Sequence, residues 1–297
     1  MRICILTPDP ADPAFEGRWS EVRDRMVAPL AAEGARVESR PWVEEPTDLR
    51  PFDLVLPLVT WGYHRAHDQW VRRCREWRTL DVRILNPPSV LEWNADKLYL
   101  ERLYELGAPV IPTVFVDRVA EADLAALAGR FGSEVLIVKP QVSASAYQTL
   151  RVRPGDPLAG APDGRAMVQP YLDAVEGEGE LSLIFFSGAF SHAIRKVAAP
   201  GDFRVQPEWG GRISAYDPPA DVRAAAEAIL AAVEEPLLYA RVDMVRDASG
   251  RPMLMELELV EPDLYLQHDA AGGRTFVEAV RSMARHRTTP AGAALST

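Results

Sequence analysis

The stretch from residue 239 to residue 260 constrains the fold more than any other part of the chain. It consists of YARVDMVR, the turn sequence DASG, and RPMLMELELV. Apolar and polar residues alternate in both arms, which is typical of half-buried strands, and the turn sequence favours a hairpin between them. With the hairpin centred near Ser249, Asp243 lies opposite Glu256 and Arg241 lies opposite Glu258.

The polar face of this hairpin predicts a concentration of charge. Alternation places Arg241 and Asp243 on one face, and Leu254, Glu256 and Glu258 on the same face. Carboxylates this close repel one another unless a cation lies among them. Mg²⁺ suits the position because it prefers a few carboxylate oxygens together with water and phosphate. The alternative is an edge hairpin with a solvated polar face, on which Arg241 and Glu258 form a surface pair.

Size and charge exclude several classes of protein. The chain has 297 residues, enough for two or three subdomains with a substantial core. Its 43 acidic and 33 basic residues give a net charge of −10, and no Lys/Arg-rich run is present, which argues against a nucleic-acid partner. No apolar stretch approaches the roughly 20 residues of a membrane span, and the apolar run at the N-terminus is too short for a signal peptide.

The two cysteines give no sign of a disulfide or a metal site. Cys4 and Cys74 stand apart from each other and lie in no metal-binding spacing. A disulfide framework or a zinc site is therefore unsupported, and a reducing compartment is the default. We expect a cytoplasmic protein without membrane or nucleic-acid partners.

The order of elements predicts an α/β (α+β) fold. Residues 3–6, 19–33, 35–42 and 52–59 alternate as strand, helix, strand and strand, which favours a small parallel sheet, with Pro57 ending the last strand or placing it at an edge. Asn94 is expected to cap a helix that carries Lys97 and ends at Gly107. The elements expected after it are 121–131, 134–139, 167–172, 181–186, 190–197, 220–233 and 275–284. We expect domains at 1–90, 91–172 and 173–297.

Several basic residues are candidates for binding an anion. Lys139 ends an apolar strand, where it either reaches the surface or aims its charge at a phosphate. The small residues at 143–146 form a loop that lets backbone N–H groups approach phosphate oxygens, although the Walker pattern is absent. Lys97 in a first helical turn opposes the helix dipole, a mild cost that hints at a ligand.

A glycine-flanked loop around Arg204 is long enough to cover a site as a lid. Lys196 lies shortly before it, at the end of an expected strand. Cations there stabilise charge during transfer of a phosphoryl group. The alternative for each residue is a basic strand end at the surface.

Taken in order, six segments resemble the successive motifs of the ATP-grasp superfamily. They are NADKLYLERLYELGAPVIPT, VLIVKPQVSASAYQT, MVQPYL, ELSLIFFSG, DFRVQPEWGG and ARVDMV with MLMELE. The resemblance covers roughly residues 90–270, and it is greatest to the glutathione synthetase and ribosomal-protein glutamate ligase branch. TPDP, LPLVTWGYH and MELELVEPDLYL are similar to the ATP-grasp cyclo-ligases that form D-cycloserine from O-ureido-D-serine. The resemblance implies an N-terminal pre-ATP-grasp domain and two lobes that enclose the nucleotide.

The resemblance also implies roles for individual residues. It assigns nucleotide binding to phosphate lysines, a covering loop, an adenine segment and a ribose acid, which are Lys97, Lys139, Ser143, Ala144, Ser145, Ala146, Gln169, Tyr171, Leu172 and Glu180. It makes Asp243, Glu256 and Glu258 the Mg²⁺ ligands. Arg241 and Arg204 would act on the transferring phosphoryl group, with Lys196 nearby. The last metal position is usually Asn in the ligase branch, whereas here it is Glu258.

These observations predict an ATP- and Mg²⁺-dependent carbon–nitrogen ligase that phosphorylates a small amino-acid-like substrate, or an intramolecular cyclo-ligase. Its expected cofactors are ATP and two Mg²⁺ ions, with Mn²⁺ as a substitute, and a homodimer is an expected assembly. Substrate contacts are expected from Thr7, Asp9, Trp61, Tyr63 and His64, whose aromatic rings could equally pack between domains. The alternatives are a nucleotide-binding scaffold without turnover and a kinase that releases a phosphorylated product.

Overall fold

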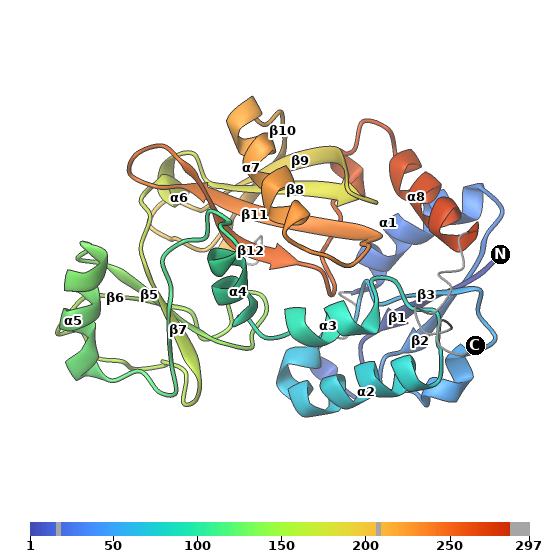
Figure 1. Cartoon of the computed structure of the whole chain (residues 1–297), viewed down its shortest axis with the longest axis horizontal. Coiled ribbons are helices and arrows are strands. Elements are labelled where there is room, and N and C mark those ends of the chain that lie inside the picture. Colours follow the sequence, from blue (N-terminus) through green and yellow to red (C-terminus); the bar gives the residue numbers. More distant parts are fainter. Residues whose placement is uncertain (16–18, 206–208, 286–297) are drawn as a thin grey trace, which may run out of the picture.

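Three sheets form the framework of the protein. The computed structural model describes residues 1–15, 19–205 and 209–285. A three-stranded sheet lies at the N-terminal end of the molecule, a four-stranded sheet lies at the opposite end, and a five-stranded sheet lies above both in the view of Figure 1. Helices and strands are mixed throughout, as the sequence predicts.

The first sheet is parallel and has the strand order β2-β1-β3. Its elements are β1 (Arg2–Thr7), α1 (Trp19–Ala32), β2 (Arg36–Pro41), β3 (Leu54–Leu56) and α2 (His67–Thr79). The third strand is shorter than expected and ends immediately before Pro57, because proline has no N–H group to donate to a neighbouring strand. The expected parallel layer is confirmed.

The prediction of a single helix from Asn94 to Gly107 is wrong. The structure has two short helices, α3 (Pro88–Asn94) and α4 (Tyr99–Glu105), and Lys97 lies in the turn between them. Asn94 ends α3 instead of capping the next helix. Its side chain bonds to the backbone of β12 (Pro252–Glu258) and the residue beyond it, donating to Leu257 O and accepting from Leu259 N, both at 2.8 Å. The dipole argument for Lys97 therefore does not apply.

The four-stranded antiparallel sheet has the order β4-β7-β5-β6. Its elements are β4 (Val114–Val116), α5 (Glu121–Phe131), β5 (Leu136–Pro140), β6 (Leu150–Val152) and β7 (Ala166–Pro170). Alternation along β5 sorts the side chains, because Leu136 and Val138 pack with Leu124 of α5. Ile137 and Lys139 point to the other side, where a cavity lies.

The five-stranded antiparallel sheet has the order β10-β9-β8-β11-β12. Its elements, besides β12, are α6 (Ala174–Gly177), β8 (Glu180–Phe186), β9 (Ala189–Val197), β10 (Arg212–Tyr216), α7 (Ala220–Ala231), β11 (Tyr239–Arg246) and α8 (Arg274–Arg285). Helix α7 packs on one face, and α1 and α8 pack against the other. Strand β10 was not predicted from the sequence, because it is a short edge strand without fully buried residues.

The hairpin of β11 and β12 has the expected register, with Asp243 opposite Glu256 and Arg241 opposite Glu258. The prediction that Leu254 shares a face with Glu256 and Glu258 is wrong. Met244 pairs with Leu254, so the register shifts at Met255 and an extra residue bulges from β12. The bulge turns Leu254 to the opposite face, where it is fully buried in the core beneath α7.

None of the helices in the described ranges combines the length and the apolar character that a membrane span requires. The expected domain boundary near residue 90 falls inside α3, and the one at residue 172 follows β7. The division into three domains stays a prediction.

Candidate functional site

One large cavity, of about 1030 Å³, is lined by the four-stranded and five-stranded sheets and by α1 and the loop at residues 61–65 of the N-terminal part. It is lined by every residue to which the sequence analysis assigns nucleotide binding, metal binding or catalysis. Trp61, Tyr63 and His64 also line it. Thr7 and Asp9 do not: Thr7 is buried in β1, and the carboxylate of Asp9 accepts the N–H of Ala11 at 2.9 Å.

Asp243 lies at the centre of a buried group of charges. Arg241 donates to both of its carboxylate oxygens, from Nε to Oδ1 at 2.9 Å and from Nη2 to Oδ2 at 2.8 Å. The Ser182 hydroxyl donates to Oδ1 at 2.6 Å, and the Lys196 ammonium lies 3.5 Å from Oδ2. Burial acts to raise the pKa of Asp243, but Arg241 and Lys196 outweigh it and hold that pKa below its ordinary value.

The other two expected metal ligands also face cations. Glu256 lies 3.0 Å from the Lys97 ammonium, and Glu258 accepts a hydrogen bond from Arg241. Both carboxylates are more open than Asp243, with side chains 30% and 26% exposed against 4%. Burial and the neighbouring Asp243 and Glu256 raise the pKa of Glu258 to about 8, against the opposing effect of Arg241.

This group of carboxylates fits Mg²⁺ by its chemistry. No cluster of three metal-ligating side chains stands ready as a cage anywhere in residues 1–15, 19–205 and 209–285. Mg²⁺ needs none, since it is usually held by one or two carboxylates, water and substrate phosphates. Glu256 and Glu258 offer oxygens open to the cavity, whereas both oxygens of Asp243 are engaged by cations.

Glu180, expected to bind ribose, forms a short ion pair with Lys196, at 2.5 Å between Oε1 and Nζ. Both side chains are buried, and the two residues are directly paired on β8 and β9. Although burial and Arg241 lower it, the carboxylates of Asp243 and Glu180 raise the pKa of Lys196 above its ordinary value. Lys196 therefore stays charged and lies between Glu180 and Asp243.

The loop at residues 143–146 contacts Lys97 directly. Lys97 donates from Nζ to Ser143 O at 2.7 Å, and its backbone N–H donates to Gln141 O at 3.0 Å. Ser145 and Ala146 have φ angles of 52° and 56°, a left-handed conformation that non-glycine residues rarely adopt. This strained turn lies where the sequence predicts a loop over phosphates.

Lys139 differs from Lys97 because it has no ion pair within the part of the chain that the structure describes. Its ammonium lines the cavity from the end of β5. Burial and the positive charge of Lys97 lower the pKa of Lys139, although Glu256 and Glu180 act in the other direction.

The segment after β7 provides an apolar wall. Leu172 packs with Ile111, Val175 and Met255, all of which line the cavity. Gln169 Nε2 donates to the Thr113 hydroxyl at 2.9 Å, and the backbone N–H of Tyr171 donates to Val135 O at 2.9 Å. That N–H is therefore already used within the protein.

Arg204 lies at the other rim, held by one neighbour and stacked on another. Its guanidinium forms two hydrogen bonds to Asp202, at 3.0 and 2.7 Å, and its Cζ lies 3.4 Å from the centre of the Trp209 ring. The hydrogen bond from Arg204 lowers the pKa of Asp202 to about 2. Part of the expected lid, residues 206–208, lies outside the described residues.

Glu261 is a cavity residue that the sequence analysis missed. It follows Glu256 and Glu258 in the segment MELELVEP, so it is a third acidic residue within six positions. The available signal was this continuation beyond the end of the hairpin. Burial and Glu258 raise the pKa of Glu261 well above its ordinary value.

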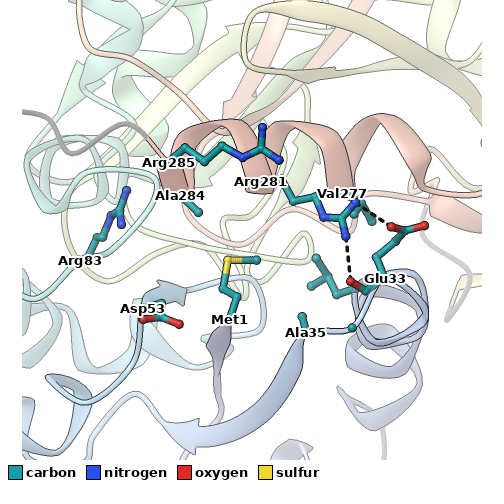
Figure 2. A pocket seen from close by; sticks show the side chains of 11 residues that line it. Met1, Glu33, Ala35, Asp53, Arg83, Val277, Arg281, Ala284 and Arg285 are labelled. Atoms are coloured by element: carbon teal, nitrogen blue, oxygen red, sulfur yellow. Dashed lines mark hydrogen bonds and ion pairs between the residues drawn. The ribbon is translucent and has the colours of Figure 1, made fainter.

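A second, smaller cavity of about 380 Å³ lies between α8 and the N-terminal end of the first sheet. Figure 2 shows Arg281 of α8 contacting Glu33 across it, through an ion pair of 2.7 Å and a hydrogen bond of 2.8 Å to the carbonyl oxygen. None of the predicted site residues lines this cavity.

Comparison with known sequences gives a family match in the N-terminal part of the chain and relatives that cover most of it. A family model described as "D-cycloserine synthetase DcsG, N-terminal domain" matches residues 3–86. Cycloserine biosynthesis protein DcsG of Streptomyces lavendulae is 32% identical over 266 residues, which make up 83% of this chain and 88% of that protein. A probable alpha-L-glutamate ligase of Shewanella pealeana is 27% identical over 202 residues, 62% of this chain and 40% of the relative.

Solved structures give the same result for the fold. The crystal structure of D-cycloserine synthetase DcsG superposes with a TM-score of 0.79 at 28% identity, covering 96% of this chain and all (100%) of that one. D-alanine–D-alanine ligase of Bacillus anthracis complexed with ATP has a TM-score of 0.71 at 18% identity, covering 96% and 97% of the two chains. The ATP-grasp ligase PsnB, solved with Mg and ADP, has a TM-score of 0.63 at 16% identity over 95% and 98%. The last two likenesses concern the fold alone.

Proposed function

Since the chain belongs to the family of D-cycloserine synthetase DcsG, and thus to the ATP-grasp carbon–nitrogen ligases, we propose that it is an intramolecular ligase. It phosphorylates a small amino-acid-like substrate and joins the activated carbon to a nitrogen of the same molecule. The ATP-grasp fold and the ATP-dependent ligase activity expected from the sequence are confirmed. Ring closure and the roles of single residues are proposals.

The observation that carries the proposal is the distribution of charge in the large cavity. Lys97 contacts the carbonyl of Ser143 and the carboxylate of Glu256, so it links the phosphate loop to the acidic strands. Lys139 adds a second cation that has no ion pair within the described ranges. The phosphates of ATP fit between these lysines and the carboxylates, since each lysine offers a compact charge to phosphate oxygen.

Glu256, Glu258 and Asp243 would hold Mg²⁺, in our proposal two ions, with Mn²⁺ as a substitute. When bound, the metal neutralises negative charge on the β- and γ-phosphates. Glu256 and Glu258 must then release Lys97 and Arg241, which become free to contact anionic groups. Arg241 would stabilise the transferring phosphoryl group from the sheet, and Arg204 would do so from the opposite rim.

The remaining residues bind the nucleotide and exclude water. Leu172 and its apolar neighbours would pack on adenine near Gln169 and Tyr171, and Glu180 would receive the ribose once its contact with Lys196 loosens. Ser143, Ala144, Ser145 and Ala146 would cover the phosphates. Closure matters because an acyl phosphate exposed to water hydrolyses.

For ring closure, the protein must mainly hold the substrate in a bent conformation, with its nitrogen near the activated carbon. Activation of the substrate carboxylate by phosphate gives an acyl phosphate, and a nitrogen of the same molecule displaces the phosphate. An intramolecular nucleophile has a large advantage in effective concentration. Trp61, Tyr63 and His64 border the cavity on the side of the first sheet, where we place the substrate. A cytoplasmic location and a homodimer are expectations that we retain as part of this proposal.

The test is incubation with ATP, Mg²⁺ and O-ureido-D-serine, its L-isomer and a panel of small amino acids with and without an added amine. We expect ADP and free phosphate only with a substrate, and a cyclic product by mass spectrometry. ADP without free phosphate would indicate a kinase, and no ADP would indicate a scaffold. Product that appears only with a second amine would replace ring closure by an intermolecular reaction.

A further inference from the structure

The charged side chains around the large cavity are almost all matched by an opposite charge. The pairs within the described residues are Lys97–Glu256, Lys196–Glu180, Arg241–Asp243, Arg25–Asp263, Arg204–Asp202 and Arg65–Asp12. Two cavity residues remain without an ion pair in residues 1–15, 19–205 and 209–285. They are Lys139, which the proposed function assigns to phosphate, and Glu261, which it leaves unused.

Glu261 is held in place by its backbone neighbours. The Tyr239 hydroxyl donates to Val260 O at 2.8 Å, and Asn86 Nδ2 donates to Leu259 O at 2.8 Å. On the other side, Arg241 Nη1 donates to Asp263 O at 3.4 Å. The segment that carries Glu261 is therefore fixed on both sides by largely buried hydrogen bonds. A fixed backbone limits the part of the cavity that its carboxylate can reach.

Tyr63, Glu256 and Glu258 line the same cavity as Glu261. Tyr63 of the first domain is buried, and after burial itself the charge of Glu261 is the largest cause that raises the pKa of the Tyr63 hydroxyl. Burial, Glu258 and Glu256 raise the pKa of Glu261, and the more distant charges of Arg241 and Lys97 oppose them without cancelling the shift. A half-buried carboxylate among like charges is unfavourable until a cation joins it.

Arg241 and Lys97 act on Glu261 from a distance, but both pair with other carboxylates, and neither forms an ion pair with Glu261 in the described part of the chain. A cation in direct contact with Glu261 must therefore come from a ligand. We propose that Glu261 binds the ammonium group of the substrate and thereby selects substrates that keep a free amino group. This inference rests on the proposed function, in which an amino-acid-like substrate is activated at its carboxylate. The ammonium group is then the part of the molecule that the reaction leaves unchanged, and Glu261 recognises it beside Tyr63.

The test compares O-ureido-D-serine with 3-(ureidooxy)propanoate, the same molecule without its amino group, in the wild type and in Glu261→Gln. Glutamine keeps the shape but removes the charge. We expect kcat/KM for the amino substrate to fall about 10- to 100-fold, the range for loss of a charged hydrogen bond. The wild-type preference for the amino substrate should nearly vanish in Glu261→Gln. Glu227→Gln, an exposed acid on α7, is the matched control and should keep the preference.

Two results would overturn the inference. One is a Glu261→Gln enzyme that keeps the full preference for the amino substrate. The other is an unchanged preference with a higher Mg²⁺ requirement, which would make Glu261 a metal ligand.

A binding measurement separates this inference from the proposed function. If the wild type turns over neither ureido compound, thermal unfolding is followed with Mg·ADP and either D-serine or 3-hydroxypropanoate. Stabilisation by D-serine alone, lost in Glu261→Gln, supports the ammonium site although the proposed reaction has failed. Equal stabilisation of wild type and variant, or none of the wild type, contradicts it.

Discussion

Arg241 grips both carboxylate oxygens of Asp243 from two positions earlier on the same strand, and both side chains are almost completely buried, at 8% and 4% exposed. The two residues share a face of β11 because side chains alternate along a strand. Arg241 reaches further to Glu258 on β12, so one guanidinium ties two of the expected metal ligands together. Its removal would leave a buried carboxylate with only Lys196 as a nearby cation.

We predict that Arg241→Ala lowers the free energy of unfolding by about 3–5 kcal/mol, the cost of breaking a buried pair from one side. Arg241→Lys should recover part of that stability but little activity, since an ammonium cannot make the two-pronged contact. Urea unfolding followed by circular dichroism measures the first effect, and ADP release measures the second. Arg223→Ala removes an exposed partner of Glu227 and a contact with the Phe190 ring, and it should change stability by about 1 kcal/mol or less. A loss below about 1 kcal/mol in Arg241→Ala would contradict this account of the pair.

The sequence predicts the hairpin well because two local rules determine it. The turn at Asp247 and Gly250 sets the register, and the two-residue period then decides which side chains share a face. The pairing of Asp243 with Glu256 follows from these rules alone. The bulge at Met255 does not, because an extra residue is decided by packing on the far face, where Leu254 fills the core beneath α7.

Other features depend on contacts between distant segments and had no local signal. Lys97 lies in a turn and not in a helix, and what fixes it is the carbonyl of Ser143 and the carboxylate of Glu256, far along the chain. The pairing of Lys196 with Glu180 depends on the register of β8 and β9. Glu261 could be seen as an acid in the sequence, but its lack of a partner is visible only in three dimensions.

Glu256→Gln should lower turnover by about 100-fold or more, as for loss of a preorganised charge. It should have little effect on the stability of the metal-free protein. The ion pair that it breaks is partly exposed, since the Glu256 side chain is 30% exposed. Its loss should therefore lower the free energy of unfolding by only about 1 kcal/mol. Thermal unfolding without metal and with Mg²⁺ plus a non-hydrolysable ATP analogue separates the two effects. Glu134→Gln, an exposed acid paired with Arg153, should behave as wild type. An active Glu256→Gln enzyme with an unchanged Mg²⁺ requirement would remove the metal role.

His64 makes stability depend on pH in a defined direction. Burial, together with the positive charges of Arg65 and Lys97 and against the charge of Asp12, lowers the pKa of His64 from 6.5 to about 4. Its Nδ1 is buried without a hydrogen-bond partner in the described part of the chain. Because the folded state keeps this ring neutral, the unfolded chain binds the proton first as the pH falls below 6.5. Stability is therefore complete above that pH and is lost towards pH 4.

The expected contribution of His64 is at most about 3 kcal/mol between pH 7 and pH 4. His64→Gln should flatten this part of the stability curve, measured as the free energy of unfolding in urea at half-unit steps of pH. Parallel curves for wild type and His64→Gln would show that the ring is protonated equally in both states.

Gly179 tests whether the backbone beside the Glu180–Lys196 pair is as tightly packed as the structure indicates. It has a φ angle of 93°, and a Cβ atom there would lie 2.3 Å from the carbonyl oxygen of Lys196. Gly107 has a similar φ angle of 87° but open space around it. The left-handed conformation costs an L-residue about 1–2 kcal/mol in either place.

Gly179→Ala should therefore lose about 2–5 kcal/mol, since the clash with fixed backbone adds about 1–3 kcal/mol of overpacking to the conformational cost. Gly107→Ala carries the conformational cost alone. The shift of β9 should also pull Lys196 away from Glu180, so the Michaelis constant for ATP should rise in Gly179→Ala and not in Gly107→Ala. Equal stability of the two variants, measured by urea unfolding, would mean that β9 yields without cost and that the ion pair is not held by the close approach of Gly179.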